Sequence, residues 1–200
     1  LGQWVLGQAC RQLRAWEDAG LRGLQLAVNI SALEFNRPGF PAQVREILRG
    51  SGVDPAQIEL EITESLLMQS LPDLSERLGE LTALGLQLAL DDFGTGYSSL
   101  GYLKRLPISR LKIDRSFVAG VPGSAEGEAI IRATLSMAHD LGLDVVAEGV
   151  ETEDQRDFLL SHGCGRLQGF LIARPMAAEA FADWWQACSD PGTHAPAAPL

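Results

Sequence analysis

The chain has 200 residues, of which 46% are hydrophobic, and it carries a formal net charge of −10. This length supports one sizeable core, and the acidic balance argues against a non-specific nucleic-acid binder, which needs a basic surface. No apolar run approaches the ~20 residues needed to cross a bilayer, so we expect a soluble domain without membrane contact. The odd number of scattered cysteines favours a reducing compartment, so we expect a cytoplasmic location, with membrane anchoring of the full-length protein through other domains left open. The three cysteines form no CxxC pair and the three histidines no HExxH motif, which disfavours a disulfide framework and a zinc site.

Hydrophobic periodicity and turn residues predict alternating helices and strands. In chain order we expect helix 1–16, strand 24–31, helix 41–52, strand 58–64, helix 72–85, strand 86–92, helix 98–106, strand 109–114, helix 124–142, strand 143–151, helix 154–163, strand 166–172 and helix 177–188. Gly50 and Gly52 are expected to stop the second helix, and Thr152 and Gln155 to form a capping box. The tail 189–200 is rich in Pro and Ala and is expected to be disordered, which leaves one domain over residues 1–188.

Strands that alternate with helices indicate parallel βαβ units. Two architectures remain open at this point, an open doubly wound sheet and a (β/α)8 barrel with part of it missing. Along residues 58–63 apolar and polar residues alternate, so that Glu59 and Glu61 share a face. All six predicted strands carry a polar residue near the C-terminal end, and in a barrel these ends converge on one mouth, where active sites lie. These residues are Asn29, Glu61, Asp91 with Asp92, Lys112 with Asp114, Glu148 and Gln168.

The stretch LALDDFGTG places two adjacent aspartates, Asp91 and Asp92, at the end of an apolar strand. Burying adjacent like charges is costly unless a cation compensates. One interpretation is that the first aspartate ends the strand and the second begins a turn. The other is that both bind divalent ions, because carboxylates suit Mg²⁺ or Mn²⁺ and a pair of such ions serves attack on a phosphodiester. Gly94 and Gly96 would let the following loop move.

Five motifs occur in the order ELEITES, DDFGTGYSSL, LKIDRSFV, VVAEGVE and QGFLIARP. Together they resemble the EAL family of cyclic di-GMP phosphodiesterases, and the resemblance runs from WVLGQACRQL to WW, nearly the whole chain. It implies a modified TIM barrel that hydrolyses cyclic di-GMP to linear pGpG with Mg²⁺ or Mn²⁺. We also expect a homodimer, and sensory or GGDEF-type domains upstream in the full protein.

The resemblance also implies a two-metal site. Carried over by position, Asn29, Glu61 and Asp91 match ligands of one metal. Asp92 matches a ligand of the second metal, with Asp91 bridging the two and Glu148 nearby.

Four further residues match positions that support catalysis in the family. Lys112 matches a lysine that orients or deprotonates the attacking water, although an ion pair with Asp114 is a structural alternative. Glu151 and Gln168 match residues that support the site and the bound nucleotide. Glu64 matches a glutamate that holds the loop after the double aspartate.

The motif that gives the family its name, Glu-Ala-Leu on an early strand, does not occur in this chain. Its glutamate is a metal ligand in the family, and the similar GEAI at 127–130 falls on a predicted helix. A typical barrel needs ~250 residues, so we expect that roughly 50 N-terminal residues with two strands are absent and that about six βα units are present. The chain also begins without Met, as a fragment would.

Two alternatives to an active enzyme therefore stay open. One is a catalytically impaired regulatory module that binds cyclic di-GMP. The other is a structural partner domain that signals through the loop and dimerisation.

Overall fold

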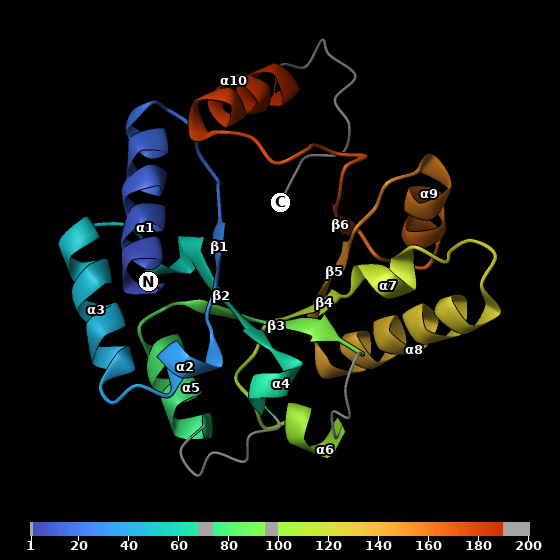
Figure 1. Cartoon of the computed structure of the whole chain (residues 1–200), viewed down its shortest axis with the longest axis horizontal. Coiled ribbons are helices and arrows are strands. Elements are labelled where there is room, and N and C mark those ends of the chain that lie inside the picture. Colours follow the sequence, from blue (N-terminus) through green and yellow to red (C-terminus); the bar gives the residue numbers. More distant parts are fainter. Residues whose placement is uncertain (1, 68–73, 95–99, 190–200) are drawn as a thin grey trace. The chain divides into compact units, whose positions relative to one another are not determined.

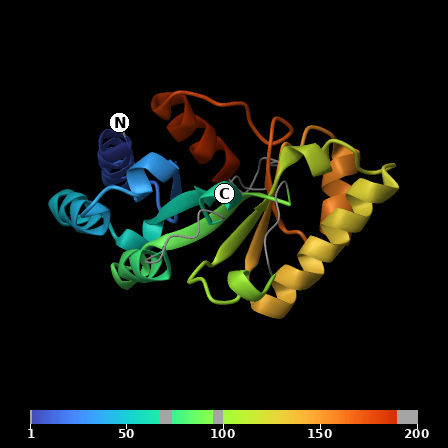
Figure 2. The ribbon, with the colours of Figure 1, turned by 60° about the horizontal axis from the view of Figure 1, so that its bottom comes forward.

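The computed structural model of the protein describes residues 2–67, 74–94 and 100–189. Its contacts divide the chain into two compact units, residues 1–110 and 111–200. In both units strands alternate with helices, as the sequence predicts (Figure 1, and turned by 60° in Figure 2). Across the described ranges, no helix combines the length and the apolar character that crossing a membrane requires.

The first unit is built on three parallel strands. Strand β1 pairs with β2, and β2 pairs with β3. Figure 1 shows helices α1, α3 and α5 outside these strands. The elements of this unit are α1 (Gly2–Asp18), β1 (Leu26–Asn29), α2 (Ala32–Phe35), α3 (Phe40–Ser51), η1 (Pro55–Gln57), β2 (Ile58–Thr63), α4 (Glu64–Leu67), α5 (Leu74–Ala83), β3 (Gln87–Phe93) and α6 (Leu100–Leu103).

Helix α1 buries a stripe of residues, Leu6, Cys10 and Leu13, at the spacing of one helix face. Helix α3 passes through Gly50 and ends at Gly52, which has a φ of 68° and donates its N–H to Leu48 O. The prediction that Gly50 stops this helix is therefore wrong, whereas Gly52 adopts the left-handed conformation typical of a helix end.

The second unit contains the later strands and the helices between them. Strand β4 (Arg110–Ile113) begins at the last residue of the first unit and is followed by α7 (Arg115–Val118), α8 (Ala125–Leu141), β5 (Asp144–Glu148), α9 (Glu153–Ser161), β6 (Arg166–Gln168) and α10 (Ala178–Ser189). Strand β5 lies between β4 and β6 and pairs in parallel with β6. The predicted capping box of α9 is confirmed, because Thr152 Oγ1 accepts from Gln155 N while Gln155 Oε1 accepts from Thr152 N.

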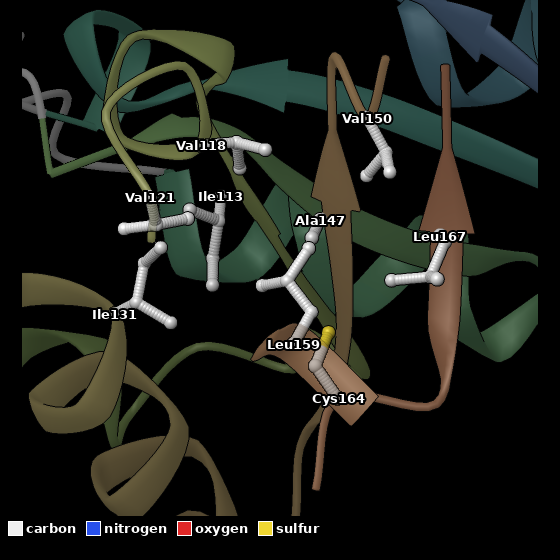
Figure 3. Packing of buried hydrophobic residues seen from close by; sticks show 9 residues of the cluster. All are labelled: Ile113, Val118, Val121, Ile131, Ala147, Val150, Leu159, Cys164 and Leu167. Carbon is white, nitrogen blue, oxygen red and sulfur yellow. The ribbon is translucent and has the colours of Figure 1, made fainter. Parts of the chain in front are cut away.

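A cluster of buried apolar side chains fills the second unit. Its members come from strands β4, β5 and β6, from helices α7, α8 and α9, and from the loops beside them (Figure 3). Cys164 lies in this cluster, where burial raises the pKa of its thiol to about 11. A thiol that stays protonated at neutral pH is a poor nucleophile and a poor metal ligand, so Cys164 serves packing.

Some expected features lie outside the described residues. These are residues 72–73 and 98–99 of two predicted helices, Gly96 of the predicted mobile loop, and positions 190–200 of the predicted tail. Helix α10 includes Ser189, so the first residue assigned to the tail is helical. Three short helices, α2, α4 and α7, were not expected from the sequence, because four residues are too few to show a helical period.

Candidate functional site

Oxygen-bearing side chains lie together on one face of the sheet in the first unit. Asn29 on β1 is the register partner of Glu61 on β2, and Glu61 is the partner of Ala89 on β3. Asp91 follows Ala89 by two positions and therefore points to the same face. Glu61 is 5% exposed and Asp91 9%, whereas Asn29 is exposed. The sheet thus aligns two buried carboxylates and an amide at the carboxyl ends of its strands.

The two adjacent aspartates differ in backbone conformation. Asp92 has a φ of 56°, in the left-handed region that few residues other than glycine adopt. Its N–H donates to Asp91 Oδ1 at 3.0 Å. Strand β3 continues through Asp92 to Phe93, so the interpretation in which the first aspartate ends the strand and the second begins a turn is wrong. The left-handed φ of Asp92 interrupts the regular alternation within the strand, so the two carboxylates need not point to opposite faces.

Glu64 begins helix α4 and is 2% exposed. Its Oε2 accepts a hydrogen bond from the N–H of Gly94, the first residue after β3, at 3.2 Å. This is the kind of contact expected of a residue that holds the loop after the double aspartate. The role of Glu64 in function stays a prediction.

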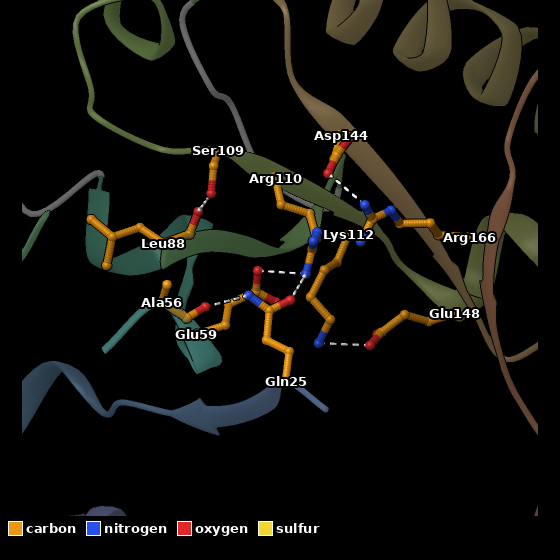
Figure 4. Close-up of polar contacts among 10 residues, drawn as sticks. All are labelled: Gln25, Ala56, Glu59, Leu88, Ser109, Arg110, Lys112, Asp144, Glu148 and Arg166. Atoms are coloured by element: carbon orange, nitrogen blue, oxygen red, sulfur yellow. Dashed lines mark hydrogen bonds and ion pairs between the residues drawn. The ribbon is translucent and has the colours of Figure 1, made fainter. Parts of the chain in front are cut away.

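The second unit places a buried lysine beside a carboxylate. Lys112 Nζ lies 2.7 Å from Glu148 Oε1, with side-chain exposures of 6% and 19% (Figure 4). Glu148 is in turn the register partner of Gln168 on β6. Three of the four predicted site residues of this unit, Lys112, Glu148 and Gln168, therefore lie on adjacent strands, at or next to the ends where the strands finish.

Asp114, the alternative partner proposed for Lys112, has a structural position of its own. It caps helix α7, and its Oδ1 accepts from Ser116 N at 3.0 Å. Burial alone would raise the pKa of this carboxyl, but hydrogen bonds from Ser116 and Arg115 and the Arg115 charge lower it below its usual value. Lys112 forms an ion pair with Glu148.

Glu151 and Gln168 have exposed side chains, and their backbones are tied into the second unit. Glu151 N donates to Gln155 Oε1 at 2.8 Å, and Val150 N donates to Gln168 O at 3.0 Å. The contact between Glu151 and Gln155 extends the capping box of α9 by one residue. Because both side chains are exposed, they are accessible to a ligand. Their roles in function stay predictions.

Two glycines next to the predicted site residues were missed by the sequence reasoning. Gly149 has a φ of 70°, and a Cβ there would meet Arg115. A Cβ on Gly169 would collide with the backbone of Val150. Because Gly149 follows Glu148 and Gly169 follows Gln168, these close approaches fix where the two site residues lie. In the sequence, the glycines inside the motifs AEGVE and LQGF could have indicated these close approaches.

A buried charged pair lies nearer the start of the strands in the first unit. Arg110 Nη1 lies 2.6 Å from Glu59 Oε2 and donates to Gln25 Oε1 at 3.1 Å (Figure 4). Glu59 shares a face with Glu61 but faces an arginine. This neutralised pair is a structural feature of the unit, and the sequence did not predict its partner.

The predicted metal ligands use oxygen donors throughout, which fits Mg²⁺ or Mn²⁺. Among the residues that the structure describes, no group of three or more His, Cys, Asp or Glu side chains lies close enough together to hold a metal ion. The Asn29 amide and the carboxylates of Glu61 and Asp91 form a mixed set on one face. Their grouping around an ion stays a prediction.

The family model of the EAL domain matches residues 1–175 of this chain. The chain belongs to the EAL domain family. The bifunctional diguanylate cyclase/cyclic di-GMP phosphodiesterase MucR of Pseudomonas aeruginosa is 48% identical over 179 residues, which are 90% of this chain and 26% of MucR. The cyclic di-GMP phosphodiesterase NbdA of the same organism is 43% identical over 187 residues, 94% of this chain and 24% of NbdA. The EAL domain thus spans about a quarter of the length of these relatives.

Solved structures agree with the family. The PaMucR phosphodiesterase in complex with c-di-GMP matches with a TM-score of 0.86 and 47% identity, over 90% of this EAL domain and 73% of that chain. Klebsiella pneumoniae BlrP1, solved as a manganese/cy-diGMP complex, matches with a TM-score of 0.77 and 32% identity, over 86% of this EAL domain and 44% of that chain. The predicted α/β fold of the EAL type is confirmed by these matches.

Proposed function

We propose that this EAL domain hydrolyses cyclic di-GMP to linear pGpG with Mg²⁺ or Mn²⁺, as part of a bacterial second-messenger system. The observation that carries the proposal is the alignment of buried Glu61 and Asp91 with Asn29 at the carboxyl ends of β1–β3. The names of MucR, NbdA and BlrP1 support the substrate, and the manganese in the BlrP1 complex supports the metal. The homodimer, the cytoplasmic location and the partner domains stay predictions.

The residues fit the metal by the chemistry of their donors. Asn29, Glu61, Asp91 and Asp92 would hold the ions, and Glu148 is the further predicted ligand. When bound, Mg²⁺ or Mn²⁺ would offset the carboxylate charges and activate water for attack on the phosphodiester.

The chain's own groups would then orient the reactants. Lys112 would act on the attacking water, and its pairing with Glu148 holds the ammonium in one place. Gly149 and Gly169 would keep the backbone beside Glu148 and Gln168 in its close packing. Gln168, which is exposed, would contact the nucleotide.

The proposal is tested by incubating the longest natural form of the protein that contains these residues with cyclic di-GMP. We expect pGpG to accumulate with Mn²⁺ or Mg²⁺. We expect none with a chelator and little with Ca²⁺, because Ca²⁺ prefers more ligands and longer bonds. Chromatography of the nucleotides measures turnover, and calorimetry measures binding. Binding without turnover in Mn²⁺ would favour a regulatory module, and the absence of both would leave the structural partner domain.

Replacing Lys112 with Ala should lower kcat by roughly 10²-fold or more, the usual scale for losing a general acid or base, with a smaller change in nucleotide affinity. The sequence offers a matched control, because it has only two lysines, Lys104 and Lys112. Lys104 is exposed, so Lys104→Ala should leave kcat unchanged. If calorimetry showed lost binding while the residual complex turned over normally, Lys112 would be a binding or folding residue.

A further inference from the structure

A cavity of about 630 Å³ opens in the second unit, apart from the predicted site residues of that unit. Its walls come from the C-terminal half of α8, the end of α9 and the starts of β5 and β6. Asp144 and Arg166 begin these two strands, whereas Glu148 and Gln168 end them. Four residue steps along β5 lead from Asp144 to Glu148, or about 13 Å at the usual rise. The cavity is therefore at the opposite end of the strands from the Lys112–Glu148 pair.

Basic side chains gather around this cavity. Arg132, His139, His162 and Arg166 line it, against the carboxylate of Asp144. Two of the three histidines in a chain of net charge −10 thus surround one cavity, together with two arginines. Carboxylates of Glu128 and Asp144 balance the two arginine charges, so it is the forked guanidinium donors, and not a net positive charge, that suit an anionic occupant.

Both guanidinium groups are oriented by carboxylates and keep donors for a ligand. Arg132 Nη1 lies 3.1 Å from Glu128 Oε2, and Arg166 Nη2 lies 3.1 Å from Asp144 Oδ2 (Figure 4 for the second pair). Within the described part of the chain, each of these ion pairs engages one nitrogen of a group that has five N–H donors. The arginine side chains are 47% and 38% exposed, so a ligand can reach the remaining donors.

His162 is held in one orientation. Its Nδ1 lies 2.8 Å from Phe158 O, and its ring lies 4.3 Å from the Phe158 ring, centroid to centroid. Nδ1 also lies 3.1 Å from Ser161 Oγ, so this nitrogen is engaged by the end of α9 and Nε2 is the ring nitrogen left for other contacts. A fixed ring costs little entropy when a ligand binds.

The floor of the cavity is apolar and firmly packed. Leu135, Leu143 and Val145 line it, and both Leu135 and Val145 pack against the buried cluster of the second unit. A pre-formed cavity of a few hundred Å³, with an apolar floor and a few convergent polar groups, is typical of a small-molecule site.

We propose that this cavity is a second ligand site, which binds a small organic anion through Arg132 and Arg166 and its apolar or aromatic body through Leu135, Leu143 and Val145. The anionic group is a phosphate or a carboxylate, both of which arginine recognises by paired hydrogen bonds. The site does not depend on the phosphodiesterase proposal. Its ligand would contact the starts of β5 and β6, the two strands whose other ends carry Glu148 and Gln168.

The test is a titration of the whole protein with phenyl phosphate and, separately, with phenylacetate, followed by calorimetry and amide NMR. We expect saturable binding with a dissociation constant near or below ~1 mM. Amide signals should shift at 143–145 and 162–166, and the probe that binds more tightly identifies the anionic group. No saturable binding of either probe would overturn the proposal. Inorganic phosphate should bind at least ~10-fold more weakly than phenyl phosphate, and equal affinity would overturn the assigned apolar floor.

The double variant Arg132→Gln with Arg166→Gln should weaken binding by at least ~10-fold, since charge-assisted hydrogen bonds are lost. Both arginines are partly exposed, so the variant should fold, which thermal unfolding checks. Arg156→Gln is the matched control, because Arg156 lies on α9, pairs with Glu153 and Asp157 and does not line the cavity. As a second variant, Ser136→Trp should fill the cavity beside Leu135 and abolish binding. Unchanged affinity in the double variant would overturn the site.

Discussion

Replacing Asp91 with Asn should lower hydrolysis of cyclic di-GMP by at least ~10²-fold, because metal ions contribute several kcal/mol to the transition state and Asp91 is proposed to bridge them. The substitution removes the negative charge and keeps the shape of the side chain. The amide that replaces the carboxylate would retain an oxygen able to accept from Asp92 N, so the left-handed conformation of Asp92 should persist. The effect should therefore fall on metal binding and turnover, with little effect on the fold.

The measurement is steady-state hydrolysis at several Mn²⁺ concentrations, with thermal unfolding as the check on folding. Asp54→Asn is the matched control, since it makes the same chemical change at the cap of η1. Asn caps a helix about as well as Asp, and that variant should keep its activity. Wild-type turnover of the Asp91 variant at saturating Mn²⁺ would remove Asp91 from the proposed metal site.

The placement of Glu61 and Asp91 near the carboxyl ends of their strands was predictable. It depends on the alternation of apolar and polar residues and on where each strand ends, and both are local properties of the sequence. Residues 58–63 alternate as expected, and Glu61 lies on the face shared with Asn29 and Asp91. The helix ends were predictable for the same reason where a specific contact exists, as at Thr152 and Gln155. Gly50 was misread because glycine is tolerated inside a helix when the next turn continues to pack.

Contacts between distant segments were not predictable from one sequence. Glu59 and Arg110 are 51 residues apart, and no local pattern links them. The same holds for Lys112 and Glu148. The sequence suggested Asp114 as an alternative partner of Lys112, because Asp114 is much closer along the chain. The left-handed φ of Asp92 also escaped prediction, because aspartate is compatible with both a strand and a turn.

Replacing Arg110 with Met should destabilise the fold by about 3–5 kcal/mol, the usual cost of removing one partner of a buried ion pair. Arg110 and Glu59 have side-chain exposures of 10% and 4%, and their charged atoms are 2.6 Å apart. Met has a similar length and keeps the apolar packing of the arginine stem. The cost arises because the Glu59 carboxylate would stay buried without the cation that the structure places beside it. Chemical denaturation followed by linear extrapolation measures the change.

The double variant Glu59→Leu with Arg110→Met distinguishes a required ion pair from a merely tolerated one. Removing both charges relieves the cost of the stranded carboxylate, so the double variant should recover most of the lost stability. Arg49→Met is the control in the same unit, because Arg49 pairs with Glu46 at exposures of 77% and 63% and should contribute at most about 0.5 kcal/mol. A double variant as unstable as Arg110→Met would mean that the unit depends on hydrogen bonds of this pair, including the contact with Gln25. Recovery would mean that hydrophobic packing can replace the pair at this position, whereas Glu61, on the same face of β2, is proposed to need its carboxylate for metal binding.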